Sequence, residues 1–291
     1  MRSKVCVRRR QVIVALGALP LARYAAAVDI ELQRTGGPYV PTPQVVVDEM
    51  LRMGKVAAGD FVVDLGSGDG IIVLTAAQKL KARGFGVDID PELVKLANAE
   101  AKKRGVADRA AFHVMDVHKA DISKATVVTL YLLPGMMIDL RAKIFGDLKP
   151  GTRVVSHDYS FGEEWAPDNQ YTWDVPEKEK VNGVPRATVY LWIIPAKVSG
   201  RWRINLAAPA SGQYDLALKQ TFQILEGTAT GGGSKGGRLG RSRLSGEEIT
   251  LSLPAGGDYH LFTGKVAGGT MEGVVQLAGG KGTARWTAQR L

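Results

Sequence analysis

The chain has 291 residues, of which 45% are hydrophobic and 23% are charged, as expected for a globular protein of one large or two medium domains. Its formal net charge is +9, but residues 1–27 contribute +6 of this through six basic and no acidic residues, and the remaining +3 argues against a nucleic-acid-binding surface. The single cysteine, Cys6, excludes disulfides and thiolate metal sites in the body of the chain.

Residues 1–27 have the pattern of a signal peptide. The basic "MRSKVCVRRR" precedes the apolar "QVIVALGALPLA", and "AAA" at 25–27 offers a cleavage site before Val28. The apolar run is shorter than the roughly 20 residues of a membrane span. We therefore expect export to the periplasm by a Sec- or Tat-type signal, with no stable membrane span after cleavage. The alternative is a cytoplasmic or membrane-associated protein with an uncleaved, basic N-terminus.

Residues 28–199 alternate between strand and helix patterns and are expected to form the first folded domain. A segment rich in Pro and Gly leads to a helix that Pro43 opens. The later pattern predicts strands at 61–65, 84–89, 110–115, 126–133, 152–157 and 188–194, and helices at 70–80, 91–104 and 134–148. Repeated strand–helix units with continuous apolar strands predict an α/β, Rossmann-like sheet with helices on both faces.

Residues 200–291 have a different character. They are rich in Gly and Thr, lack a helical period, and contain short alternating runs such as "WRINL" and "EEITLSL" separated by turn residues. This pattern predicts seven or eight antiparallel strands in a small barrel or sandwich of unknown role. We expect "GGGSKGG" at 231–237 to be a flexible hairpin loop.

A glycine-rich turn, "DLGSGDG", directly follows the first strand of the α/β region. Its spacing is G-x-G-x-G at Gly66, Gly68 and Gly70, whereas dinucleotide folds use G-x-G-x-x-G. Asp64 at the start of this loop would repel a pyrophosphate but attract a cation. The α-ammonium group of S-adenosylmethionine is such a cation, and the glycines let the backbone approach its methionyl part closely.

Two further acids follow the next two strands. Asp88 lies 22 residues after Gly66, where an acid would bind the ribose hydroxyls, and Asp116 would lie near the adenine amino group. Because the carboxyl ends of parallel strands meet at one edge of a sheet, Asp64, Asp88 and Asp116 are expected to converge there. Each acid alone has a structural interpretation, but together they predict an S-adenosylmethionine site.

These motifs carry a family resemblance over roughly residues 38–195. "DLGSGDG" followed by "GVDIDPELV" resembles the class I, seven-β-strand methyltransferases. "PYVPTP" at 38–43, "TLYLLP" at 129–134 and "KPGTRVVSHD" at 149–158 resemble one branch, that of the ATP-synthase c-subunit lysine methyltransferase and its bacterial relatives. The resemblance implies an S-adenosylmethionine-dependent enzyme that N-methylates a lysine side chain, with a protein as its partner.

The resemblance also assigns site residues. It implies that a group from the N-terminal segment and the first three strand ends contacts the cofactor: Tyr39, Thr42, Asp64, Gly66, Ser67, Gly68, Asp88, Ile89 and Asp116. Catalytic residues toward the acceptor would be Tyr131, His157 and Asp158. One departure is Ile71, where relatives often have an arginine, and it weakens the inference about the substrate more than that about the cofactor.

Other functions remain open at this stage. "YLLP" after the fourth strand is not the N-P-P-Y-type tetrad that indicates methylation of adenine or of glutamine amides. No metal site is expected, because His113 and His118 have poor ligand spacing. The alternatives are a small-molecule methyltransferase and an exported, non-catalytic binding protein that retains the fold. The sequence predicts no oligomeric state.

Overall fold

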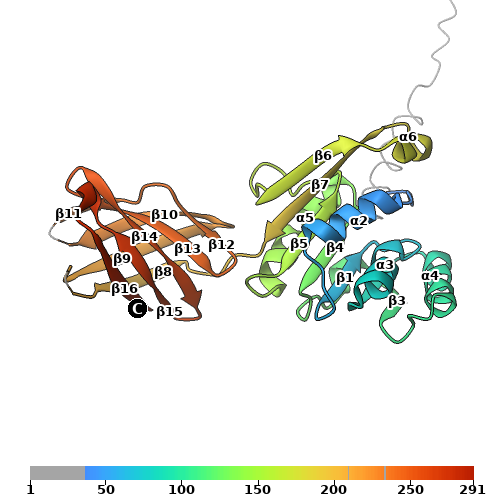
Figure 1. The fold of residues 1–291 in the computed structure, drawn as a ribbon, viewed down its shortest axis with the longest axis horizontal. Coiled ribbons are helices and arrows are strands. Elements are labelled where there is room, and N and C mark those ends of the chain that lie inside the picture. Colours follow the sequence, from blue (N-terminus) through green and yellow to red (C-terminus); the bar gives the residue numbers. More distant parts are fainter. Residues whose placement is uncertain (1–36, 209, 233) are drawn as a thin grey trace, which may run out of the picture.

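A computed structural model describes residues 37–208, 210–232 and 234–291, so the expected signal peptide lies outside the described residues. The α/β domain contains a seven-stranded sheet in the order β3-β2-β1-β4-β5-β7-β6 (Figure 1). Strands β1 to β5 are parallel, β7 is antiparallel to β5, and β6 is antiparallel to β7. The strands are β1 (Phe61–Leu65), β2 (Arg83–Asp88), β3 (Ala110–Val114), β4 (Val127–Leu130), β5 (Arg153–His157), β6 (Asn169–Asp174) and β7 (Arg186–Ile193).

Helices cover both faces of this sheet, as predicted. Helices α2 (Gln44–Met53), α3 (Ile71–Leu80) and α4 (Pro91–Lys103) contribute to one buried apolar cluster, and α5 (Pro134–Asp147) contributes to the other. Because successive strand residues face opposite sides, Val62 belongs to the first cluster and Val63 to the second.

The chain also folds locally as its capping residues predict. Pro43 directly precedes α2, and Pro91 occupies the first turn of α4. Asp90 caps α4 by accepting hydrogen bonds from the amides of Glu92 and Leu93.

Two elements were missed by the sequence analysis. Strand β6 lies at the edge of the sheet, with five of its six residues exposed, so it lacks the alternation of buried and exposed residues that identifies a strand. It leads to α6 (Pro176–Asn182), whose single buried residue is Lys178. Helix α6 has no apolar face, and β6 has only Tyr171 and Trp173, of which Trp173 packs partly buried against the core.

Residues 200–290 form a closed antiparallel barrel. Eight strands pair in the ring β10-β12-β13-β14-β15-β16-β8-β9, which the β9–β10 pairing closes. Their bounds are β8 (Gly200–Leu206), β9 (Gly212–Thr221), β10 (Ile224–Gly231), β12 (Ser242–Ser245), β13 (Glu248–Ala255), β14 (Asp258–Ala267), β15 (Thr270–Gln276) and β16 (Thr283–Arg290). Trp202, Trp286 and Phe262 fill its interior.

The prediction of a flexible hairpin loop at 231–237 was partly wrong. Residues Ser234–Arg238 form strand β11, which pairs antiparallel with β10 beyond the ring. Gly232 forms a turn directly after β10, and the register of the β10–β11 pairing shifts between Ala229 and Gly231.

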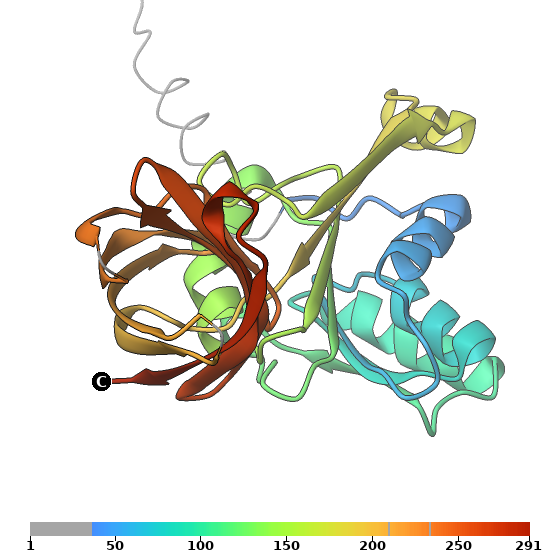
Figure 2. The same ribbon diagram turned by 60° about the vertical axis from the view of Figure 1, so that its left-hand side comes forward.

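The barrel packs against the edge of the α/β sheet at which the parallel strands begin (Figure 2). Phe222, between β9 and β10, stacks on Trp165 with ring centroids 4.3 Å apart. Gln223 donates to the carbonyl of Ala166, and Arg243 pairs with Asp168 at 3.1 Å. The barrel thus contacts the amino edge of the sheet, away from the carboxyl edge at which the glycine loop lies.

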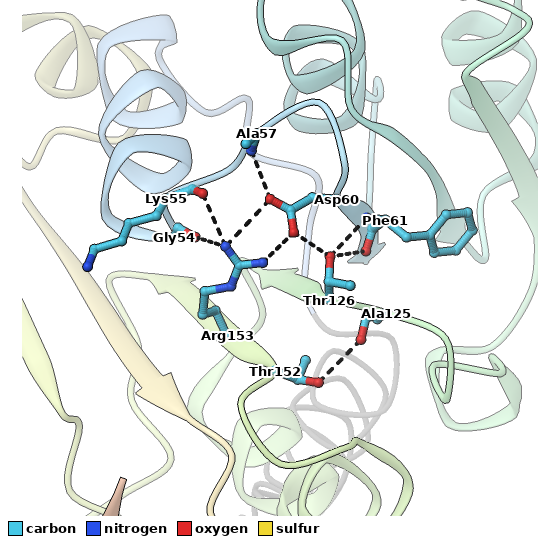
Figure 3. A network of polar contacts seen from close by, with 9 residues as sticks. All are labelled: Gly54, Lys55, Ala57, Asp60, Phe61, Ala125, Thr126, Thr152 and Arg153. Carbon is cyan, nitrogen blue, oxygen red and sulfur yellow. Dashed lines mark hydrogen bonds and ion pairs between the residues drawn. The ribbon is translucent and has the colours of Figure 1, made fainter. Parts of the chain in front are cut away.

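A polar network ties the starts of β1, β4 and β5 together at the same amino edge (Figure 3). The guanidinium of Arg153 pairs with Asp60, and the Thr126 hydroxyl donates a 2.7 Å hydrogen bond to the same carboxylate. Arg153 also donates to the carbonyls of Gly54 and Lys55, just after α2. In the part of the chain that the structure describes, no helix is long and apolar enough to span a membrane.

Candidate active site

The glycine loop between β1 and α3 uses backbone conformations that favour glycine. Gly66, Gly68 and Gly70 have φ of 79°, 52° and 81°. A Cβ on Gly66 would lie 2.6 Å from the Leu132 side chain, and one on Gly70 would lie 2.6 Å from the ring of Phe112. The loop therefore packs too closely against its neighbours for any larger residue at these two positions.

Asp64 lies at the carboxyl end of β1, where it is 2% exposed. Its Oδ1 accepts a 2.6 Å hydrogen bond from the hydroxyl of Thr129 on β4. Burial raises the pKa of Asp64 to about 7, against the lowering effect of Thr129, and the nearby carboxylates of Asp88 and Asp69 raise it further. A buried acid with this raised pKa has a carboxylate that a bound cation would stabilise.

Asp88, at the end of β2, holds the glycine loop in place. Its Oδ2 accepts a 2.8 Å hydrogen bond from the amide of Gly68, and its Oδ1 accepts from the amide of Asp90. The next residue, Ile89, is 47% exposed and offers an apolar surface beside the loop. The predicted ribose-binding residue thus also shapes the loop.

Asp116 follows β3, and its Oδ1 caps a short 3₁₀ helix by accepting from the amide of His118. The amide of Met115 donates to the carbonyl of Asp88, so the ends of β2 and β3 lie side by side. The structure therefore places Asp64, Asp88 and Asp116 along one edge of the sheet, as the spacing predicted.

The segment before α2 lies over this loop. The Tyr39 ring is close to Gly68, since a Cβ on that glycine would lie 2.7 Å from it. Burial raises the pKa of the Tyr39 hydroxyl, and Asp69 raises it further, so this hydroxyl stays protonated. Thr42 is half-buried at the end of the same segment.

These residues fit S-adenosylmethionine. The buried carboxylate of Asp64 suits its cationic methionyl end. Ser67 Oγ is buried against Gly86 of β2 and has no hydrogen-bond partner among the described residues. The exposed side chain of Ile89 suits the flat face of adenine.

The three residues predicted to face the acceptor also come together. Tyr131 follows β4, and its ring lies 4.1 Å from the ring of His157 at the end of β5. Its hydroxyl is 3.5 Å from Oδ2 of Asp158. Leu132, the residue after Tyr131, contacts Gly66, so this group of residues adjoins the glycine loop.

Asp158 is held in an unusual backbone conformation, with φ of 61°. Its amide donates to the carbonyl of Thr188, and its Oδ1 accepts from the amide of Thr188. These two hydrogen bonds with the start of β7 fix the carboxylate beside Tyr131.

The anion of this site is Asp158, which is paired with the ammonium of Lys178. Burial lowers the pKa of His157 to about 4, against the opposing effect of Asp158, so the imidazole is neutral at pH 7. Burial also raises the pKa of the Tyr131 hydroxyl, as does Asp158. Asp158 therefore faces two neutral rings, and neither repels an ammonium group.

Lys178 on α6 is a site residue that the sequence analysis missed. Its side chain is buried and its Nζ lies 2.7 Å from Oδ2 of Asp158. A lysine in an exposed, charged segment gives no sequence signal of this contact. Thr129 was also missed, although a threonine within the apolar run of β4 is such a signal.

Ile71, at the position where an arginine was expected, begins α3 and packs partly buried against the core. Among the described residues, no group of three or more His, Cys, Asp or Glu side chains is arranged to hold a metal ion.

Comparisons with known proteins agree with this geometry. Residues 64–169 match the family described as the ANTKMT methyltransferase domain. A protein-lysine N-methyltransferase of Saccharolobus islandicus is 42% identical over 159 residues, which cover 54% of this chain and 93% of that protein. The ATP-synthase c-subunit lysine N-methyltransferase of Xenopus laevis is 32% identical over 157 residues, covering 53% of this chain and 68% of that protein.

Among solved structures, an RNA methyltransferase from Salinibacter ruber in complex with S-adenosyl-L-homocysteine is 50% identical. It covers 55% of this chain and 96% of its own, with a TM-score of 0.49. The two lysine methyltransferases match only about half of this chain.

Proposed function

We propose that this chain, which belongs to the class I S-adenosylmethionine-dependent methyltransferases, transfers the methyl group to the side-chain nitrogen of lysine residues in a protein. Because the chain belongs to this family, it is a methyltransferase enzyme and its cofactor is S-adenosylmethionine. The choice of lysine is supported by the names of its relatives and by one feature of the site. This feature is the Asp158 carboxylate, which already binds a lysine ammonium, that of Lys178.

When bound, the cofactor would supply a methyl group attached to a sulfonium sulfur. The acceptor nitrogen would form a bond to the methyl carbon in line with the carbon–sulfur bond, which breaks and leaves a neutral thioether. The chain's own task is to hold the acceptor in line within a site that excludes water. The half-buried ring of Tyr131 packs against the buried ring of His157, and this pair forms a neutral surface next to the glycine loop.

An acceptor lysine must lose a proton before it can attack. With an ordinary pKa near 10.4, roughly one lysine in a few thousand is neutral at pH 7. Burial of the amine disfavours its charged form, whereas the Asp158 carboxylate favours it, so the proton must pass to water before the methyl group is transferred. Oδ2 of Asp158 orients the nitrogen by accepting one of its hydrogens. The neutral His157 adds no opposing charge.

Transfer of a radiolabelled methyl group in a cell lysate tests this function. The full chain is incubated with labelled S-adenosylmethionine, and the labelled protein is hydrolysed and searched for methyl-lysines. Asp88→Ala is the matched control, because it removes a predicted cofactor contact and the loop hydrogen bond from Gly68. We expect methyl-lysine with the unchanged chain and none with the variant. Label that is removed by nuclease, or that appears only in small molecules, would exclude the proposal.

We also propose export of the mature chain, on the pattern of residues 1–27 alone. Mass spectrometry of the protein from fractionated cells is the test. A mature N-terminus at Val28 in a periplasmic fraction supports export, and an intact Met1 in the cytosol contradicts it.

A further inference from the structure

Helix α6 buries a single side chain against the domain, and at its end the exposed Asn182 side chain interacts with Tyr131. Of its seven residues, six are exposed and only Lys178 is buried. Short helices normally gain their stability from packing an apolar face, and α6 has no such face. The only side chain that α6 buries is therefore a charged one.

That side chain ends at the acceptor site. Its Nζ lies 2.7 Å from Oδ2 of Asp158 and donates a hydrogen bond to the carbonyl of Arg186. The Tyr131 hydroxyl lies 3.5 Å from the same Asp158 oxygen, and α6 connects β6 to β7 at the carboxyl edge of the sheet (Figure 1). Lys178 thus reaches the carboxylate that faces Tyr131 and His157.

An acceptor lysine would present the same chemistry, an ammonium on a stem of four carbons. Two ammonium groups repel each other, and one carboxylate oxygen with a neighbouring Tyr hydroxyl has little room for both. Only one of them binds Oδ2 of Asp158 at a time.

We propose that Lys178 latches α6 over the acceptor site by occupying the position on Asp158 that the ammonium of an acceptor lysine takes. This inference rests on the proposed lysine-methylating function, and it explains how the enzyme selects its acceptor. Binding of the acceptor and closure of α6 compete for one carboxylate. An acceptor with a long stem and a positive charge displaces Lys178, whereas a neutral nucleophile leaves α6 closed.

Hydrogen exchange of the α6 amides, measured by millisecond pulse labelling, tests the latch. The full chain is saturated with S-adenosylhomocysteine and probed with n-butylammonium, which imitates a lysine side chain, or with n-butanol as its uncharged counterpart. We expect faster exchange of α6 with n-butylammonium and no change with n-butanol. If neither probe changes the exchange rate of the α6 amides, the proposal is wrong.

Two variants complete the test. Lys178→Met keeps the apolar stem and removes the charge, so the α6 amides should exchange at least roughly tenfold faster without any probe and stop responding to n-butylammonium. Lys180→Met, an exposed lysine of the same helix, should behave as the unchanged chain. Exchange of Lys178→Met at the rate of the unchanged chain would contradict the latch.

The outcome is separable from that of the proposed function. Exchange of α6 is read without methyl transfer, whereas lysine methylation is read from the labelled hydrolysate. If Lys178→Met fails to fold, which fast exchange of the β4 and β5 amides would reveal, the response of the unchanged chain to n-butylammonium decides the matter alone.

Discussion

The hydroxyl of Thr129 donates a 2.6 Å hydrogen bond to Oδ1 of Asp64, and both side chains are buried where β1 and β4 end beside the glycine loop. The bond partly offsets the burial that raises the pKa of Asp64 to about 7. This pair therefore controls whether Asp64 itself is negatively charged near pH 7.

Cofactor affinity should depend on pH through Asp64. A positively charged ligand binds the carboxylate form, so the affinity for S-adenosylmethionine should rise up to tenfold per pH unit below about 7 and level off above it. Calorimetric titrations between pH 5.5 and 7.5 measure this. Asp64→Asn should bind more weakly with no such dependence, and a flat profile for the unchanged chain would contradict the assignment.

The raised pKa of Asp64 should also make the cofactor-free protein less stable as pH rises, whereas cofactor binding becomes stronger. The pKa of Asp64 is raised from 3.8 to about 7, so between these values the native state keeps a proton that the unfolded state loses. The free energy of unfolding should therefore fall as pH rises through this window, by roughly 4 kcal/mol from this group. Urea denaturation of the unchanged chain and of Asp64→Asn at several pH values isolates this contribution.

Removal of the Thr129 hydroxyl should move the pH profile. Thr129→Val keeps the shape of the side chain but removes a hydrogen bond to a charged group, so the rise in affinity should shift upward by about one pH unit. Thr126→Val is the matched control, because it removes a threonine–aspartate bond at the amino edge. It should lower stability without moving the profile, and equal profiles for the two variants would contradict the role of Thr129.

A comparison of Gly68→Ala with Gly105→Ala should separate the effect of backbone strain from that of a steric clash with Tyr39. Gly68 and Gly105 both have positive φ, 52° and 66°, so alanine at either costs about 1 kcal/mol of stability. Only at Gly68 would the new Cβ meet a neighbour, the Tyr39 ring at 2.7 Å. We expect Gly68→Ala to weaken cofactor binding at least tenfold and Gly105→Ala to leave the dissociation constant unchanged. Equal effects on binding would show that Tyr39 does not close over the loop.

The network at the amino edge should affect stability alone. Arg153→Met breaks the ion pair with Asp60 and leaves that partly buried carboxylate with only the Thr126 hydroxyl and the Ala57 amide. Thermal and urea unfolding should show a loss of about 2–3 kcal/mol. Cofactor affinity should not change, and a large loss of affinity would mean that the two edges are coupled.

The sequence allowed the cofactor half of the site to be predicted because its chemistry is local. Asp64, Asp88 and Asp116 each end a strand with an apolar core face, and the order of parallel strands then brings them to one edge. The acceptor half depends on β7 returning antiparallel beside β5. Tyr131, His157 and Asp158 were suggested by resemblance; Tyr131 and His157 meet because β4 and β5 are parallel neighbours, but the position of the Asp158 carboxylate depends on its hydrogen bonds with Thr188 of β7.

Lys178 was beyond sequence reasoning for a related reason. It stands among Glu177, Glu179 and Lys180, a pattern that indicates a solvated surface, and its burial depends on where α6 is placed in space. The architecture of the C-terminal domain could not be predicted from the sequence either. Alternating runs predict barrels and sandwiches equally, and the pairing of β9 with β10 decides between them.

The place at which the barrel is attached bears on how large an acceptor this enzyme can serve. Its contacts through Phe222, Gln223 and Arg243 all lie near the amino edge of the sheet. The approach to Asp158 from the opposite edge is bounded by α6 and the segment of Tyr39 rather than by the barrel. The barrel therefore does not stand between the Asp158 edge and an approaching acceptor, whatever the size of the acceptor.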